Sequence, residues 1–233
     1  PYGWSGTVTP YKTGYHFTPV SRTYGNVQAD QTSQNYTAQT CVSCVDVNVL
    51  IGGAPNGSYT LAVGESTCQS YPSVNNGPVQ IASTNAVQIL GAERVIYKVN
   101  GVNTSFSELM ALPNSQLSTT YWLPFYNNVD LDTQLRFGNV SASTASVRLY
   151  IGGVEQSGCT STPAKTYPYS LNPGESLRVS CVGLSNGPVK IVGDQNIVAA
   201  ERVIYKVDGV NTSFTELMAL PESQLSTTYW LPF

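Results

Sequence analysis

Residues 92–125 read AERVIYKVNGVNTSFSELMALPNSQLSTTYWLPF, and residues 200–233 repeat this stretch as AERVIYKVDGVNTSFTELMALPESQLSTTYWLPF. The two copies differ at three positions only: Asn100/Asp208, Ser107/Thr215 and Asn114/Glu222. Shorter matches precede each copy in the same order, at a period of about 108 residues. A period of this length corresponds to a whole domain, so the sequence predicts two tandem copies of one domain.

The residues upstream of each copy have the pattern of short β-strands. Ser143–Tyr150 alternates, with Ala145, Val147 and Leu149 on one face. Turn-forming motifs such as NPGE, SNGP and GDQN separate segments that are rich in β-branched and apolar residues. Strands of this length, recurring about every 8–12 residues, predict an antiparallel sandwich of about seven strands in each repeat.

A capping-box motif predicts a short helix near the end of each repeat. Ser213 is followed three residues later by Glu216, and Pro221 would end the helix. The twin helix would begin at Ser105 and stop at Pro113. The predicted organisation is an N-terminal extension (1–21), a first sandwich (22–103), a short helical linker (104–117), a second sandwich (118–208), and a short helix with a C-terminal strand (209–233).

Composition favours an extracellular protein and disfavours nucleic acid as a partner. Charged residues make up only 11% of the chain, and its net charge is −3 without runs of Lys or Arg. No apolar run approaches the ~20 residues of a membrane span. The first residue is Pro1 rather than Met, from which we expect that a leader has been removed. Five glycosylation sequons are compatible with this location: Asn35, Asn56, Asn103, Asn139 and Asn211.

The five cysteines fit an oxidising compartment. Cys159 and Cys181 are alone in the second repeat, so we predict a disulfide between them that closes a loop of about 20 residues. In the first repeat we expect Cys68 to pair with Cys41 or Cys44, which leaves one cysteine over. Parity along the strand places Cys41 on the core-facing side, which slightly favours Cys41–Cys68, but the pairing stays open.

Few residues have the chemistry of a catalytic or metal site. His16 is the single histidine, and a Cys₃His zinc site around it would lack the second Cys-x-x-Cys motif that such sites usually contain. The run NNVDLD offers Asp130 and Asp132 as Ca²⁺ ligands, but it reads better as a polar turn entering a strand, and calcium binding there stays open. We therefore expect no catalytic residue, no cofactor and no metal, and hence a protein that is not an enzyme.

The string TTYWLPFYNNVDLDTQLRFGNVS, followed by YIGG, GPVKI and AERVIYKV, resembles the tandem Ig-like repeats of large bacterial surface proteins. The resemblance covers nearly all of residues 115–233 and, less closely, residues 22–114. It implies two tandem Ig-like antiparallel β-sandwiches, and it is typical of stalks, surface coats, adhesins and filaments. Residues 1–21 do not match the YWLPFYNN opening of the repeat.

Two classes of function are consistent with these observations. The first is a structural subunit of a surface filament or pilus-like fibre, with a second copy of the chain as its partner. The alternative is a carbohydrate-binding or adhesin module, in which Trp4, Trp122 and Trp230 would stack on a surface glycan. We favour the structural subunit, because Trp122 and Trp230 occupy equivalent strand positions and core packing explains them more simply.

The phase of the repeat predicts how such a subunit would assemble. Residues 118–125 should form the first strand of the second sandwich, and the same eight letters recur at residues 226–233 with no domain after them. We expect this segment to insert into the first domain of another copy. Two alternatives stay open: the chain is an excerpt of a longer array, or Tyr15–Val20 completes the first domain. The predicted intersubunit strand is Tyr229, Trp230, Leu231, Pro232 and Phe233.

Overall fold

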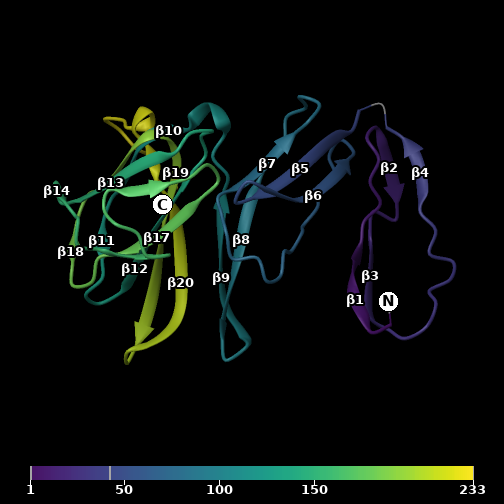
Figure 1. Cartoon of the computed structure of the whole chain (residues 1–233), viewed down its shortest axis with the longest axis horizontal. Coiled ribbons are helices and arrows are strands. Elements are labelled where there is room, and N and C mark those ends of the chain that lie inside the picture. Colours follow the sequence, from purple (N-terminus) through teal and green to yellow (C-terminus); the bar gives the residue numbers. More distant parts are fainter. Residues whose placement is uncertain (1, 42, 233) are drawn as a thin grey trace. The chain divides into compact units, whose positions relative to one another are not determined.

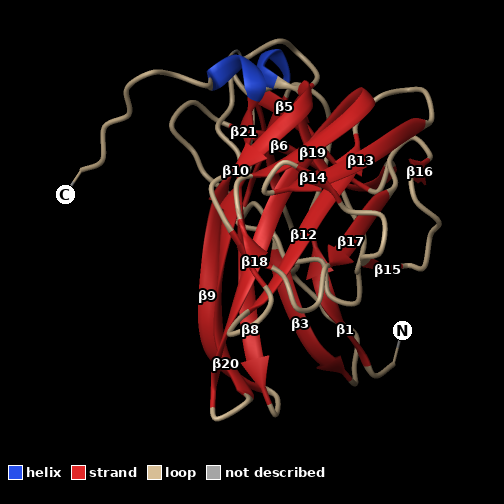
Figure 2. Cartoon of the chain, turned by 90° about the vertical axis from the view of Figure 1, so that its left-hand side faces the viewer, coloured by secondary structure: helices blue, strands red, loops and turns tan. Residues whose placement is uncertain are grey.

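The computed structural model describes residues 2–41 and 43–232, and its regular elements are almost all antiparallel strands (Figure 2). Strands hold 54% of the residues and helices 3%, and no helix in the described part reaches 7 residues. The predicted all-β class is therefore confirmed. The chain divides into two compact units: unit 1 is Pro1–Leu50, Pro55–Val74 and Gln80–Ile89, and unit 2 is Ile51–Ala54, Asn75–Val79 and Leu90–Phe233.

Unit 2 is organised around its longest strand, β19 (Val189–Val207) (Figure 1). The first half of β19 pairs on one side with β10 (Ser118–Leu123) and on the other with β13 (Ala145–Ile151). Its second half pairs with β12 (Asp132–Asn139) and β20 (Val210–Met218). One strand thus belongs to two sets of neighbours.

A bulge in β19 explains this double membership. Ser118 faces Ile197 whereas Thr120 faces Val192, so the register shifts between these positions. A side chain on Gly193 would lie 2.8 Å from the backbone oxygen of Gln195, which leaves room only for glycine. The GDQN segment is therefore a bulged part of one strand, and the prediction of a turn there is wrong.

The main order of the large sheet is β14-β13-β19-β12-β17-β15, with β16 paired to β13 and β21 paired to β10. Its further strands are β14 (Val154–Glu155), β15 (Thr160–Thr162), β16 (Tyr169–Leu171), β17 (Ser176–Ser180) and β21 (Leu220–Pro221). Strands β11 (Tyr126–Asn127) and β18 (Ser185–Asn186) form a separate two-stranded sheet. Side chains from both halves of the sheet meet in one buried cluster that includes Tyr121, Phe137, Leu149, Tyr169 and Ile191. The sheet therefore folds over a single core.

Unit 1 contains three smaller sheets, in the orders β1-β3, β2-β4 and β6-β5-β7. Their strands are β1 (Trp4–Val8), β2 (Tyr15–Thr18), β3 (Arg22–Val27), β4 (Thr37–Thr40), β5 (Val45–Ile51), β6 (Ala54–Leu61) and β7 (Val79–Ser83). The central strand β5 carries the most buried apolar side chains of this unit, Val45, Val47 and Val49. Pairing with β4 occupies β2, so the segment around Tyr15 is not a partner of β7.

The segments predicted as helices form strands, and this prediction is wrong. Residues 105–110 belong to β9 (Val102–Met110), which pairs with β8 (Ala92–Val99), and residues 213–218 belong to β20. Glu108 accepts hydrogen bonds from Arg94 across the ladder at 2.6 and 2.8 Å, so it does not cap a helix. In the described residues, each of these two hairpins is followed by a short 3₁₀ turn, at Asn114–Gln116 and Glu222–Gln224. The predicted helical linker is thus a β-hairpin followed by a short turn.

Two disulfides are present among the described residues. Cys159 is bonded to Cys181, the pair expected from the sequence, with a Cα–Cα distance of 4.4 Å. The second joins Cys41 to Cys44, whose Cα atoms are 5.4 Å apart, and it leaves Cys68 free and exposed. The expectation that Cys68 would pair with Cys41 or Cys44 is therefore wrong, because the backbone places Cys41 and Cys44 within bonding distance of each other.

Candidate assembly interface

Strand β10 shows how the repeated segment STTYWL is held when it has a partner. Tyr121 lies opposite Ile191 and Leu123 lies opposite Val189, and all four side chains are buried. Trp122 points to the other face, where the ammonium group of Lys190 lies 4.9 Å from its ring centroid. Alternate residues of this strand thus fill the core and cover a cation.

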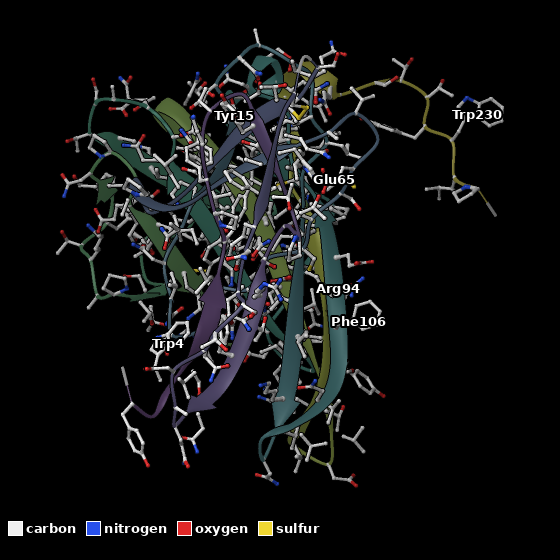
Figure 3. The ribbon with its side chains drawn as sticks, turned by 90° about the vertical axis from the view of Figure 1, so that its right-hand side faces the viewer. Trp4, Tyr15, Glu65, Arg94, Phe106 and Trp230 are labelled. Carbon is white, nitrogen blue, oxygen red and sulfur yellow. A yellow bond between two sulfur atoms is a disulfide. The ribbon has the colours of Figure 1, made fainter. Side chains whose placement is uncertain are left out.

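The second copy of the same letters, at residues 226–231, belongs to no strand. Trp230 is 91% exposed, and Tyr229 and Leu231 are exposed as well. Figure 3 shows Trp230 on an extended tail that leaves the folded part of unit 2. The Ser226 amide donates to the Tyr229 hydroxyl at 2.8 Å, as the Ser118 amide does to Tyr121 at 3.2 Å. The two copies thus share this local contact and differ in having a partner strand.

The residues predicted to form the intersubunit strand lie in this tail. Tyr229, Trp230, Leu231 and Pro232 all lie in it and are exposed to solvent. Phe233, the last residue of the prediction, lies outside the described residues.

Strand β10 pairs with the first part of β19. In the first repeat, the strand equivalent to that part of β19 is β7. Gly77-Pro78-Val79 matches Gly187-Pro188-Val189, and Gly52 donates to Pro78 as Gly152 donates to Pro188, at 2.9 and 3.0 Å. β7 pairs with β5 as β19 pairs with β13, but in the described chain it has no strand on its other side. Val79 is 45% exposed and Val189 is fully buried, so the missing neighbour leaves apolar surface open.

The other residues singled out in the sequence have local partners. The nitrogen Nδ1 of His16 lies 3.4 Å from Glu65 Oε2. In the NNVDLD run, the side-chain oxygen of Asn127 accepts from the backbone amides of Val129 and Asp130, and Asn128 donates to Asp132 at 3.3 Å. This is the hydrogen bonding of a polar turn.

The tryptophans also lie in separate environments. The ring of Trp4 lies 5.9 Å from that of Tyr24 in unit 1, Trp122 lies beneath Lys190, and Trp230 lies on the tail. Trp122 and Trp230 belong to one unit, but Trp122 is held in strand β10 whereas Trp230 is 91% exposed. Trp122 and Trp230 are therefore related by the sequence repeat and not by a shared environment.

The prediction that the tail inserts into the first domain names no acceptor strand, and the hairpins were missed. The open edge of β7, with Val79 and Ile81, is found only when the two repeats are aligned strand by strand. A local signal did mark the hairpins: Asn100-Gly101 and Asp208-Gly209 are Asn-Gly and Asp-Gly pairs with positive φ at both residues. Such pairs are typical of tight β-turns, and they outweigh the capping-box motif.

Comparisons with protein-family models, with curated proteins and with solved structures find no match to this chain. In the described residues, no helix is long and apolar enough to cross a membrane. The same residues contain no group of three or more His, Cys, Asp or Glu side chains placed to hold a metal ion.

Proposed function

We propose that this protein is a non-enzymatic, extracellular structural subunit that assembles head to tail, its C-terminal segment pairing with strand β7 of a second copy. One observation carries the proposal: STTYWL is a buried sheet strand at residues 118–123 and an exposed, unpaired segment at residues 226–231. The tandem Ig-like sandwich architecture, with β10 as the model for the donated strand, belongs to the same proposal.

The pairing of β10 predicts the register of the donated strand. In unit 2, Tyr121, Trp122 and Leu123 face Ile191, Lys190 and Val189. By the same register, Tyr229, Trp230 and Leu231 would face Ile81, Gln80 and Val79 of the receiving copy. Burying the Tyr229 and Leu231 side chains would contribute about 2 kcal/mol each, which opposes the entropy lost when the tail becomes ordered.

The positions of donor and acceptor determine the symmetry of the assembly. The donor lies in the second repeat and the acceptor in the first, so each added copy presents a new donor. Such a contact is heterologous, and it generates an open fibre unless the rotation between copies closes a ring. The two disulfides and the low charge content support an extracellular location for this fibre.

Complementation between two variants tests the proposal. Leu231→Asp should disable the donor, and Ile81→Asp should disable the acceptor, because each places a charge in an apolar contact. Each variant alone should remain monomeric in sedimentation velocity, whereas the wild-type chain forms long polymers. An equimolar mixture should stop at a 1:1 heterodimer, since one good donor and one good acceptor remain.

A synthetic peptide with the sequence of residues 226–233 provides a second measurement that needs no variant. It should cap the acceptor edge and shorten wild-type fibres in electron micrographs, while a peptide with Asp in place of Leu231 should not. Val63→Asp, at an exposed position outside β7, is the control variant and should polymerise normally. Wild-type protein that is monomeric at high concentration, or fibres that persist after deletion of Tyr229–Phe233, would contradict strand donation. A monomer would instead favour the glycan-binding alternative.

A further inference from the structure

The two copies of the 92–110 sequence form two β-ribbons within unit 2, each with two distinct faces. Ribbon 1 is β8 with β9, and ribbon 2 is the second half of β19 with β20. Cross-strand pairs define one face, which we call the arginine face: Arg94, Ile96, Phe106 and Glu108 in ribbon 1, and Arg202, Ile204, Phe214 and Glu216 in ribbon 2. The opposite, tyrosine face carries Tyr97, Ser107 and Leu109 in ribbon 1, and Tyr205, Thr215 and Leu217 in ribbon 2.

The tyrosine face of ribbon 1 packs on the arginine face of ribbon 2. The rings of Tyr97 and Phe214 lie 5.3 Å apart at an angle of 60°. The backbone amide of Glu216 donates to the hydroxyl of Ser107 at 3.0 Å. Figures 1 and 2 both show β9 running alongside β20, as these contacts require. The contact buries Ile204 and Phe214 of ribbon 2.

Two faces are not covered by another ribbon: the arginine face of ribbon 1 and the tyrosine face of ribbon 2. Phe106, the twin of Phe214, is 60% exposed, whereas Phe214 is 6% exposed. Figure 3 shows Phe106 and Arg94 next to each other on ribbon 1. A hollow on this bare face is lined by Arg94, Ile96, Asn103, Thr104, Ser105 and Phe106. At the other end of the stack, Tyr205 and Leu217 of ribbon 2 are also exposed. Each exposed surface is therefore one half of a contact that the chain already makes internally.

We infer that a second copy of this chain covers the bare arginine face of ribbon 1 with the tyrosine face of its own ribbon 2. The inference rests on the proposed head-to-tail assembly and adds a second interface to it. In this interface Tyr205 of one copy packs on Phe106 of the next. The hydroxyl of Thr215 accepts from the backbone amide of Glu108, as Ser107 accepts from Glu216.

The single substitution within the contact preserves its chemistry. Position 107 is Ser and position 215 is Thr, and both offer a hydroxyl oxygen to a backbone amide. The Arg94–Glu108 ion pair is exposed, and its twin Arg202–Glu216 keeps the same 2.6 Å distance where ribbon 1 covers it. Covering ribbon 1 thus requires no rearrangement of the pair.

The polarity of this contact agrees with strand donation. The donated tail and the free tyrosine face both belong to the second repeat, while the open β7 edge and the free arginine face both belong to the first. Within unit 2, the chain that leaves ribbon 1 likewise becomes β10 of the second repeat. Two independent features therefore predict the same order of subunits along the fibre.

Cysteine cross-linking in the full chain tests the ribbon contact directly. In a Cys68→Ser background, the double variant Phe106→Cys/Tyr205→Cys should give a ladder of covalent oligomers on a non-reducing gel after mild oxidation. The matched control is Tyr97→Cys/Phe214→Cys, which joins residues already in contact within one chain and should give a monomer band without a ladder. A mixture of the two single variants, Phe106→Cys and Tyr205→Cys, should give dimers only.

Alanine variants give the energetic counterpart. Phe106→Ala should leave the melting temperature of the monomer unchanged and raise the concentration needed for fibre formation about tenfold, because one aromatic pair per interface is lost. Phe214→Ala should lower the melting temperature instead. Fibres that form without the cross-linked ladder, or with no dependence on Phe106, overturn ribbon stacking and leave strand donation standing. A ladder and fibres that both survive deletion of Tyr229–Phe233 overturn strand donation and leave ribbon stacking standing.

Discussion

Asn139 is predicted to be one of the strongest single contributors to the stability of unit 2. Its side chain is fully buried, and its amide nitrogen donates to the carbonyl oxygens of Ser143 at 2.7 Å and Leu171 at 3.0 Å. Its side-chain oxygen accepts from the backbone amide of Ser141 at 2.9 Å and from the hydroxyl of the same residue at 2.7 Å. This side chain thus connects the end of β12 to the following turn and to β16.

Asn139→Ala removes these four hydrogen bonds and leaves the carbonyl group of the buried Leu171 without this partner. With a net value of about 1 kcal/mol for each bond, and allowance for partial rehydration, we expect the free energy of unfolding to fall by about 3 kcal/mol. For a unit of this size the melting temperature should fall by about 6–12 °C. Asn26, the equivalent residue in the first repeat, is exposed and lies in unit 1, so Asn26→Ala is the matched control.

Trp122 can report the unfolding of unit 2 alone. In a Trp4→Phe/Trp230→Phe background it is the only tryptophan, and the loss of Trp230 also weakens the proposed polymer contact. Urea unfolding followed by Trp122 fluorescence should show the full loss for Asn139→Ala and no change for Asn26→Ala. A loss below about 1 kcal/mol for Asn139→Ala, or an equal loss for both variants, would refute the role assigned to this hydrogen-bond cluster.

Two further predictions use the same single-tryptophan protein. Burial raises the pKa of Glu201 from its ordinary value of 4.5 to about 7. Because this carboxyl ionises first in the unfolded chain, its contribution to stability should fall by about 3 kcal/mol as the pH rises from 4.5 to 7 and stay level above, and Glu201→Gln should remove this contribution in unfolding titrations. Replacing Cys159 and Cys181 together by Ala should cost about 3 kcal/mol, because the bridge closes a loop with a sequence separation of 22. An oxidised wild type no more stable than the double variant would contradict that estimate.

Sequence reasoning predicted the features that depend on local pattern and on repetition. The all-β class followed from alternating apolar residues, and the equivalence of residues 118–123 with 226–231 followed from the repeat. The helices at residues 105–113 and 213–221 were wrong because a capping box is defined by only two residues. In the fold, Glu108 and Glu216 bond to Arg94 and Arg202 across a ladder instead.

The ribbon contacts could not be predicted from sequence in the same way. Phe106 and Phe214 have nearly identical neighbours along the chain, yet one is exposed and the other is buried. Their difference depends on whether another ribbon lies over them, which is a property of the tertiary arrangement and not of the local letters. The disulfide between Cys41 and Cys44 also depends on the backbone path, which brings their Cα atoms within 5.4 Å.

The bulged strand β19 has a mechanical consequence. Without a break in the covalent chain, it runs from the half of the sheet that receives β10 to the ribbon that packs against its twin. Consider a strand that pairs with its neighbour in the way β10 pairs with β19. Tension on that strand would act parallel to β19, so the hydrogen bonds between the two strands would be loaded in shear, all together instead of one after another. The continuous backbone of β19 would then transmit the force to the ribbon. The force would therefore be carried by hydrogen-bonded strands and not by a loop.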